Sequence, residues 1–213
     1  MVPSNTPTTC YVNPNTGDDN ATGTQSAPFK TITHALQQVS TGERIQLASG
    51  TYNAANGERF PLRIIDGVTV IGNEANKGEG IFIEGGGAYS SPSNARFDFN
   101  ITFLIEGNVE LRGVTITNSN NRGSGLWIES PTAITPTVAN CTFKNCDIEG
   151  VFVAEAASPK ILDSVFSENK GYGIALTANA KGEIRKNLLQ KNGVGIDTQD
   201  RVAPLIAWRF YAG

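Results

Sequence analysis

The sequence predicts an all-β fold, a right-handed parallel β-helix of about six coils with a short N-terminal capping helix. Two observations lead to this prediction: a repeat of about 23 residues in the second half of the chain, and a composition with 23 glycines and one methionine. A period of this length, built of short strands and tight turns, is typical of solenoids. In a solenoid each coil leaves an apolar face that only the next coil covers.

The first column of the repeat is a short apolar stretch that recurs six times. Its first apolar residues follow one another at intervals of 22, 23, 25, 23 and 22 residues. The stretches are GIFIEG (80–85), TFLIEG (102–107), GLWIES (125–130), GVFVAE (150–155), GIALTA (173–178) and GIDTQD (195–200).

A second column consists of apolar pairs whose members stand five residues apart. Between the two members, at one offset, the chain carries mostly Gly, Asn or Asp, which tolerate a left-handed bend. The pairs are Leu111/Ile116, Val138/Phe143, Ile161/Phe166, Ile184/Leu189 and Leu205/Phe210, with Ile65/Val70 predicted two repeats before Leu111. Asparagines after the pairs mark a further turn at Asn118, Asn145, Asn169 and Asn192.

We predict one domain over residues 1–213, with a cap module at about 11–53 and coils at about 60–213. An insertion loop interrupts the coils near 86–100. In the cap module, Thr31 is suited to begin a short helix whose Ile32, Leu36 and Val39 form one apolar face. That face would seal the first coil, and His34 would lie away from it, exposed.

The C-terminal end of the predicted solenoid has no comparable cap. The stretch PLIAWRFYAG (204–213) continues the repeat and stops within it. Unpaired strand edges invite pairing with another chain. A homodimer through this end is therefore one prediction, and a natural protein that continues beyond it is the other.

Charge and motifs exclude several classes of function. The net charge is −3 and the pI is about 5.2, without a basic patch, so nucleic acid is not an expected partner. No apolar run reaches membrane-spanning length, and the N-terminus lacks the features of a signal peptide. The three cysteines are expected to be free thiols. No P-loop, dinucleotide fingerprint or zinc-ligand spacing is present.

The cap module carries a family resemblance. Its matching pieces are Tyr11-Val12, Pro14, Gly17-Asp18, Gly23-Thr24, 28–32 (PFKTI) and 50–52 (GTY). The stretch resembles the opening module of bacterial right-handed parallel β-helix proteins of unknown function. They share it with the family-nine polysaccharide lyases of the pectate lyase-like superfamily.

This resemblance implies a secreted or cell-envelope protein that binds polysaccharide or acts on it. The lyases that share this module use a calcium cluster of acidic residues on the strand face, with a lysine or arginine on an adjacent coil as base. The module itself caps the helix and does no chemistry, so the resemblance is specific for the fold and not for an activity.

The repeat also predicts which side chains share the outward face, where equivalent residues stack about 4.8 Å apart. An apolar stripe is predicted beside a ladder of carboxylates. We predict that six of these residues bind polysaccharide, because flat aromatic faces hold sugar rings and carboxylates bind hydroxyl groups. They are Phe82, Trp127, Phe152, Glu84, Glu106 and Glu129.

Two alternatives to this surface remain open. In one, the N-terminal arm or the 88–100 loop covers the stripe, which is then core. In the other, the stripe binds another protein, as exposed apolar patches often do. Calcium would relieve repulsion within the ladder, but splayed side chains would relieve it too, so no cofactor is assigned.

The sequence shows no catalytic constellation. No lysine or arginine is predicted at the outward positions of these strands, so a lyase base is missing. Glu106 and Glu129 could meet the carboxylate spacing of a hydrolase, but so would any stacked acidic pair. We therefore predict a non-catalytic polysaccharide-binding or structural module. A polysaccharide lyase or glycoside hydrolase acting through the stacked glutamates is the first alternative, and assembly through the C-terminal edge is the second.

Overall fold

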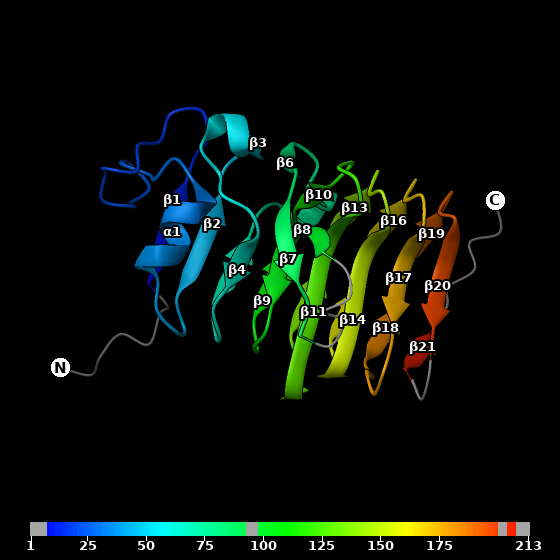
Figure 1. Cartoon of the computed structure of the whole chain (residues 1–213). Helices are drawn as coiled ribbons and strands as arrows, with labels where there is room; N and C mark the ends of the chain where they lie inside the picture. Colours follow the sequence, from blue (N-terminus) through cyan, green and yellow to red (C-terminus); the bar gives the residue numbers. More distant parts are fainter. Residues whose placement is uncertain (1–7, 93–97, 200–203, 208–213) are drawn as a thin grey trace.

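The structure is a computed structural model, and it describes residues 8–92, 98–199 and 204–207. Its strands form three parallel sheets that run along a solenoid, so the predicted β-helix is confirmed (Figure 1). Each complete coil adds one strand to each sheet, and most of the connections between sheets are turns. A short helix, α1 (Ile32–Gln38), packs at the first coils.

We name the sheets A, B and C in the order in which each coil passes through them. Sheet A holds β1 (Thr9–Val12), β2 (Arg44–Leu47), β5 (Thr69–Ile71), β9 (Glu110–Arg112), β12 (Thr137–Ala139), β15 (Lys160–Leu162), β18 (Glu183–Arg185) and β21 (Leu205–Ala207). Sheet B holds β3 (Gly50–Asn53), β6 (Ile81–Glu84), β10 (Thr115–Thr117), β13 (Thr142–Lys144), β16 (Val165–Ser167) and β19 (Leu188–Gln190). Sheet C holds β4 (Leu62–Ile64), β8 (Asp98–Ile105), β11 (Gly123–Ile134), β14 (Glu149–Ala157), β17 (Tyr172–Leu176) and β20 (Val194–Thr198).

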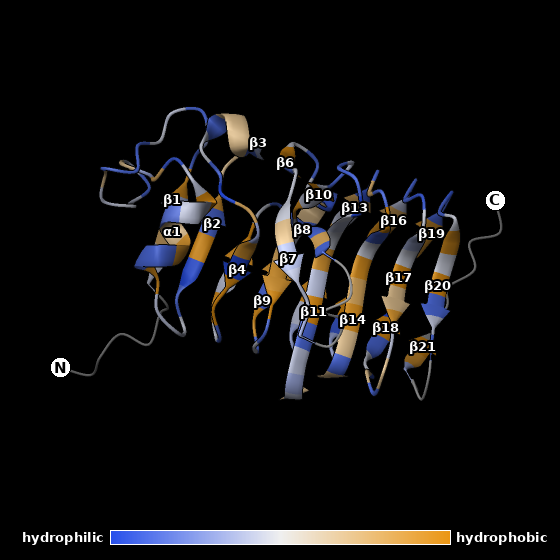
Figure 2. Cartoon of the chain, viewed as in Figure 1, coloured by the Kyte–Doolittle hydropathy of each residue, from blue (hydrophilic) through white to orange (hydrophobic). Residues whose placement is uncertain are grey.

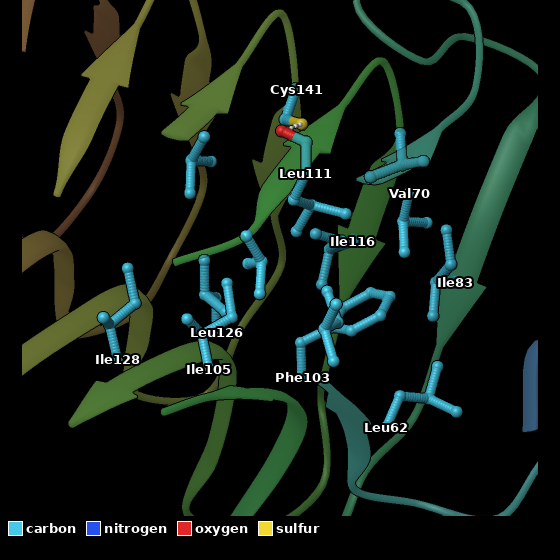
Figure 3. Packing of buried hydrophobic residues seen from close by; sticks show 14 of the residues in the cluster. Leu62, Val70, Ile83, Phe103, Ile105, Leu111, Ile116, Leu126, Ile128 and Cys141 are labelled. Atoms are coloured by element: carbon cyan, nitrogen blue, oxygen red, sulfur yellow. Dashed lines mark hydrogen bonds between the residues drawn. The ribbon is translucent and has the colours of Figure 1, made fainter. Parts of the chain in front are cut away.

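Apolar side chains from all three sheets meet inside the solenoid. Figure 3 shows Leu111, Ile116 and Phe103, one from each sheet, pointing toward a common interior, and all three are fully buried. Equivalent residues also stack along the axis: the rings of Phe143 and Phe166 lie 5.1 Å apart and nearly parallel. The turns between the strands are mostly hydrophilic, whereas the strands carry hydrophobic bands (Figure 2). Each coil therefore depends on its neighbours for its core.

The register of the later repeats is as predicted. Phe103, Leu126, Val151, Ile174 and Ile196 stand side by side in sheet C. The residues that follow them, Leu104, Trp127, Phe152, Ala175 and Asp197, pair in the same way.

The predicted register of the first repeat is wrong. Ile81 and Phe82 belong to β6 in sheet B, where Phe82 pairs with Thr115. Their predicted place in sheet C is taken by β4, in which Leu62 pairs with Phe103. The cause is the insertion between β6 and β8, which lengthens one coil. Because GIFIEG has apolar residues at every second position, as the later repeats do, it resembles them although it lies in another sheet.

Two members of the second column are also misplaced. Val70 pairs directly with Leu111, one coil away and not two, and Ile65 is 40% exposed. At the other end, Ile206 pairs with Ile184, so Leu205 faces outward and is 64% exposed. Phe210, Trp208 and Tyr211 lie outside the described residues.

The turn from sheet A to sheet B bends through the left-handed region, as the second column predicts. Its residues take φ angles of 62°, 53°, 49° and 58° at Gly113, Asn140, Asp163 and Lys186. Lys186 is the member for which this conformation is least favourable, because Gly has no Cβ and the short polar side chains of Asn and Asp bond locally.

We expect Lys186→Asn to raise the free energy of unfolding by about 0.5–1 kcal/mol, because it removes a left-handed lysine. Urea denaturation followed by circular dichroism measures this change. Asn140→Lys, the reverse exchange at the equivalent position, should lower the stability. A loss of stability in Lys186→Asn would show that the lysine makes a compensating contact.

The turn from sheet B to sheet C holds a stack of buried amides. Asn169 is fully buried, and its Oδ1 accepts the N–H of Cys146 at 3.0 Å. Its Nδ2 donates to the carbonyl oxygen of Phe143 at 3.2 Å and to Oδ1 of Asn192 at 2.8 Å. Cys146 occupies the equivalent stack position one coil earlier, while Asn145 takes the left-handed bend before it.

The helical cap forms as predicted. Thr31 Oγ1 accepts the N–H of His34 at 3.0 Å, and Ile32 and Val39 are buried. His34 differs from the prediction: it is half-buried, with its ring edge-on against Phe29 at 4.6 Å. The buried carboxylate of Glu58 also caps the helix, since it accepts the N–H groups of Ile32 at 2.7 Å and of the next residue at 2.9 Å.

Candidate functional site on the outer face of sheet C

A hairpin covers part of the outer face of sheet C. Its first strand, β7 (Gly87–Ser90), pairs antiparallel with the first half of β8 and crosses in front of the sheet (Figure 1). Tyr89 and Phe99 face each other across this hairpin and are both buried. The hairpin lies within the insertion predicted near 86–100.

Trp127 lies beneath this hairpin and is 1% exposed. Its ring is 4.5 Å from that of Phe99 and 5.9 Å from that of Tyr89, and it stacks on Phe152 at 4.0 Å. Ile101 and Leu104 complete this outer cluster, which is separate from the interior core. Of the alternatives for the stripe, the structure has the one in which the insertion covers it, since Tyr89 and Phe99 of the hairpin lie over Trp127.

Glu129 holds the hairpin in place. Its carboxylate is 4% exposed and accepts hydrogen bonds from Tyr89 Oη at 2.8 Å, Ser91 Oγ at 2.8 Å and Trp127 Nε1 at 3.0 Å. Two of these donors come from the hairpin and one from β11. Glu129 and Trp127 are therefore packed against the protein's own chain and not presented to a ligand in this conformation.

The other predicted residues do not form one surface. Glu106 is exposed and pairs with Arg63 of β4. Phe152 is half-buried beside Trp127. Phe82 and Glu84 lie in sheet B, where Lys144 Nζ stands 5.4 Å from the Phe82 ring centroid. The predicted glutamate ladder therefore does not exist as three stacked carboxylates: Glu84 is in another sheet, and Ala154 is the next neighbour of Glu129.

An arginine groove opens beside this face, between α1 and β4. It has a volume of about 340 Å³, and Arg63 stands at its edge with its guanidinium 5.9 Å from the Tyr89 ring centroid. The groove is lined by Thr33, Leu36, Gln37, Arg59, Phe60, Pro61, Leu62 and Arg63. Sequence analysis missed it because β4 was not recognised as a strand of sheet C. In that strand Arg63 pairs with Leu104 and so occupies an outward position.

The carboxylates of this face do not fit the calcium cluster that the resemblance implies. Glu106 is paired with Arg63, and Glu129 is buried against three donors. In the part of the chain that the structure describes, no three His, Cys, Asp or Glu side chains are grouped to hold a metal ion. Burial raises the pKa of Cys141 and Cys146 to about 12, so these free thiols stay protonated.

A buried carboxylate at the start of β14 titrates unusually. Glu149 is 6% exposed and accepts a hydrogen bond from Ser124 Oγ. Burial raises its pKa above the ordinary value of 4.5. The folded protein therefore holds the carboxyl proton of Glu149 more tightly than the unfolded chain does. The stabilisation by protonated Glu149 is complete below pH 4.5 and is lost as the pH rises through the raised pKa.

We expect Glu149→Gln to remove this part of the pH dependence. The free energy of unfolding of the wild type should fall, relative to that of the variant, as the pH rises from 4.5 through the raised pKa of Glu149. Urea denaturation at a series of pH values measures both curves. The burial of Glu58 raises the pKa of that carboxyl in both proteins, so its effect cancels in the difference. Parallel curves would contradict the expectation.

Comparison with known proteins identifies the family. The model of the family described as "Protein of unknown function (DUF1565)" matches residues 15–205. The chain belongs to the DUF1565 family. No match was found among the curated proteins compared. In this DUF1565 protein, no helix among the described residues is long and apolar enough to cross a membrane.

Two solved structures resemble this DUF1565 protein. Pectate lyase Pel9A matches with a TM-score of 0.61 and 18% sequence identity, over 85% of this chain and 47% of that chain. A rhamnogalacturonan lyase matches with a TM-score of 0.44 and 15% identity, over 90% of this chain and 53% of that chain. The chain thus spans about half the length of these proteins. The likeness to Pel9A shows a shared β-helix fold.

Proposed function

We propose that this DUF1565 protein is a non-catalytic β-helix module, secreted or held in the cell envelope, that binds an acidic polysaccharide in the arginine groove. The observation that carries the proposal is the placement of Arg59 and Arg63 in one groove with Phe60, at the edge of sheet C. The fold shared with a pectate lyase supports polysaccharide as the ligand, as an analogy and no more.

The groove has the chemistry that acidic sugars require. A guanidinium binds a carboxylate through two parallel hydrogen bonds, and an aromatic ring packs against the apolar face of a sugar. The pair between Arg63 and Glu106 does not block this role, because both side chains are about half exposed, at 55% and 49%. An exposed pair of this kind contributes only about 0–1 kcal/mol, so a sugar carboxylate can replace Glu106.

A polysaccharide lyase is the second candidate function. Sequence analysis found no lysine or arginine at the outward positions of the repeated strands, but it did not include β4, on which Arg63 stands outward. The family resemblance implies that a lyase would use an arginine or lysine of this kind, on a neighbouring coil, as its base. The burial of Glu129 against three donors, together with the poor fit to a calcium cluster, favours binding over catalysis.

The test is retention of the protein on polygalacturonate and on a neutral glucan, with and without calcium. We expect retention on the acidic polymer, weakened by salt, with affinity lowered about tenfold in Arg63→Gln because a charge-assisted hydrogen bond is lost. Lys144→Gln is the matched control, since it removes the same charge from sheet B.

The outcomes separate the candidates. Unsaturated chain ends released by the wild type and not by Arg63→Gln would establish the lyase. Equal retention of Arg63→Gln and Lys144→Gln would show that the groove is not the binding site. Absence of retention on every polymer would overturn the binding proposal and leave a structural role.

A further inference from the structure

A second cavity lies at the corner where sheet A turns into sheet B. Its volume is about 260 Å³, and it is lined by Lys77, Asp163, Ser164, Val165, Lys186, Asn187 and Leu188. None of these residues belongs to the arginine groove or to the outer cluster of sheet C. The cavity therefore needs its own explanation.

An arm, residues 72–80, brings Lys77 to this cavity. The arm contains the short 3-10 helix η2 (Glu74–Asn76) and runs across neighbouring coils. The carboxylate of Glu74 accepts hydrogen bonds from Arg112 at 3.1 Å and Asn140 at 2.8 Å. Thr142 Oγ1 donates to the carbonyl oxygen of Lys77 at 2.9 Å. These bonds hold the arm against the neighbouring coils.

The arm covers part of one outward column of sheet B and stops before its apolar end. In this column Thr115, Thr142, Val165 and Leu188 stand in register. The two threonine hydroxyls donate to the arm, at Gly78 and Lys77. Beyond the arm, Val165 and Leu188 line the cavity, and Leu188 is 48% exposed. A large apolar side chain left exposed in a cavity is a common feature of binding sites.

Three charged residues, Lys77, Lys186 and Asp163, line the cavity beside this apolar pair. Lys77 Nζ donates to the carbonyl oxygen of Asp163 and so reaches over the cavity. Lys186 stands at the left-handed bend, where the equivalent residues of earlier coils are Gly, Asn and Asp. A lysine is unfavourable in that conformation, and here it lines the cavity.

We propose that this cavity binds a small organic acid, a carboxylate on a short apolar body. The carboxylate pairs with the ammonium groups of Lys77 and Lys186, and the apolar body packs on Val165 and Leu188. The volume of about 260 Å³ suits a small molecule. The site is independent of polysaccharide binding in the arginine groove.

The test is a titration of the full-length, isotope-labelled protein with hexanoate, followed by two-dimensional NMR. We expect saturable shifts of the amide signals of Lys77, Lys186 and Leu188. The affinity for 1-hexanol, which lacks the charge, should be about tenfold lower.

Lys186→Asn is the decisive variant. It removes one ammonium group, and because asparagine tolerates the left-handed bend, the variant should fold at least as well as the wild type. We expect its affinity for hexanoate to fall about tenfold. Lys160→Asn removes the same charge from an exposed position of sheet A and should bind as the wild type does.

Three results would overturn the proposal: no saturable shifts, equal affinity for hexanoate and hexanol, or undiminished binding by Lys186→Asn. Arg63→Gln should bind hexanoate normally whatever its effect on polysaccharide. Loss of hexanoate binding in Arg63→Gln would therefore place the acid in the arginine groove and not here.

Discussion

Trp127→Ala is expected to lower the free energy of unfolding by about 3–5 kcal/mol, the usual cost of removing a buried aromatic ring from a packed core. Trp127 is 1% exposed and packs against Tyr89, Phe99 and Phe152. The substitution also removes the indole N–H that Glu129 accepts at 3.0 Å. A buried carboxylate that loses a donor is penalised further.

Urea denaturation followed by circular dichroism measures this loss. Phe152→Ala is the matched control, because Phe152 stacks on the same indole but is only half-buried, so its loss should be smaller. If Trp127→Ala cost less than about 1 kcal/mol, the hairpin would not be packed on sheet C in solution, since a ring in a packed core costs more. Trp127 would then return as a candidate for binding sugar.

Asn169→Ala is expected to cost about 3–5 kcal/mol, although it removes only a small polar side chain. The substitution leaves the N–H of Cys146 and the carbonyl oxygen of Phe143 without this amide, inside the protein. Each buried backbone group left without a partner costs about 1–3 kcal/mol. The amide of Asn192 loses its neighbour as well.

The same denaturation experiment tests this expectation. Lys160→Ala, at an exposed position of sheet A, should change stability by no more than about 0.5 kcal/mol. Asn169→Asp sharpens the test, because it keeps the shape and the acceptor but loses the Nδ2 donor. We expect it to lie between the wild type and Asn169→Ala at acid pH, where the carboxyl is protonated. Stability equal to the wild type in Asn169→Ala would mean that water replaces the amide.

Sequence periodicity was sufficient for the solenoid because every coil repeats the same requirements. Phe103, Leu126 and Val151 must each fill the interior, and Asn140 and Asp163 must each bend the chain at one offset. These requirements recur at fixed intervals, so they are visible without coordinates. The helical cap was predictable for a similar reason, since Thr31 and the apolar stripe after it are local signals.

The candidate site was much less predictable. Glu129, Trp127 and Tyr89 meet only because the insertion folds back over sheet C, and a hairpin interrupts the periodicity on which the prediction rests. The same insertion shifted the apparent register of Phe82 and Glu84 by one sheet. Arg63 was overlooked because β4 is only three residues long and carries no repeat signature of its own.

The sequence by itself therefore determined the β-helix, the bends between its sheets and the cap, because short-range periodicity specifies which residues face inward. Only the tertiary structure decided which outward residues are covered and which stay exposed. The hairpin buries Trp127 and Glu129, and the 72–80 arm stops short of Leu188. Coverage of an outward face depends on contacts between segments distant along the chain, and a repeat contains no information about them.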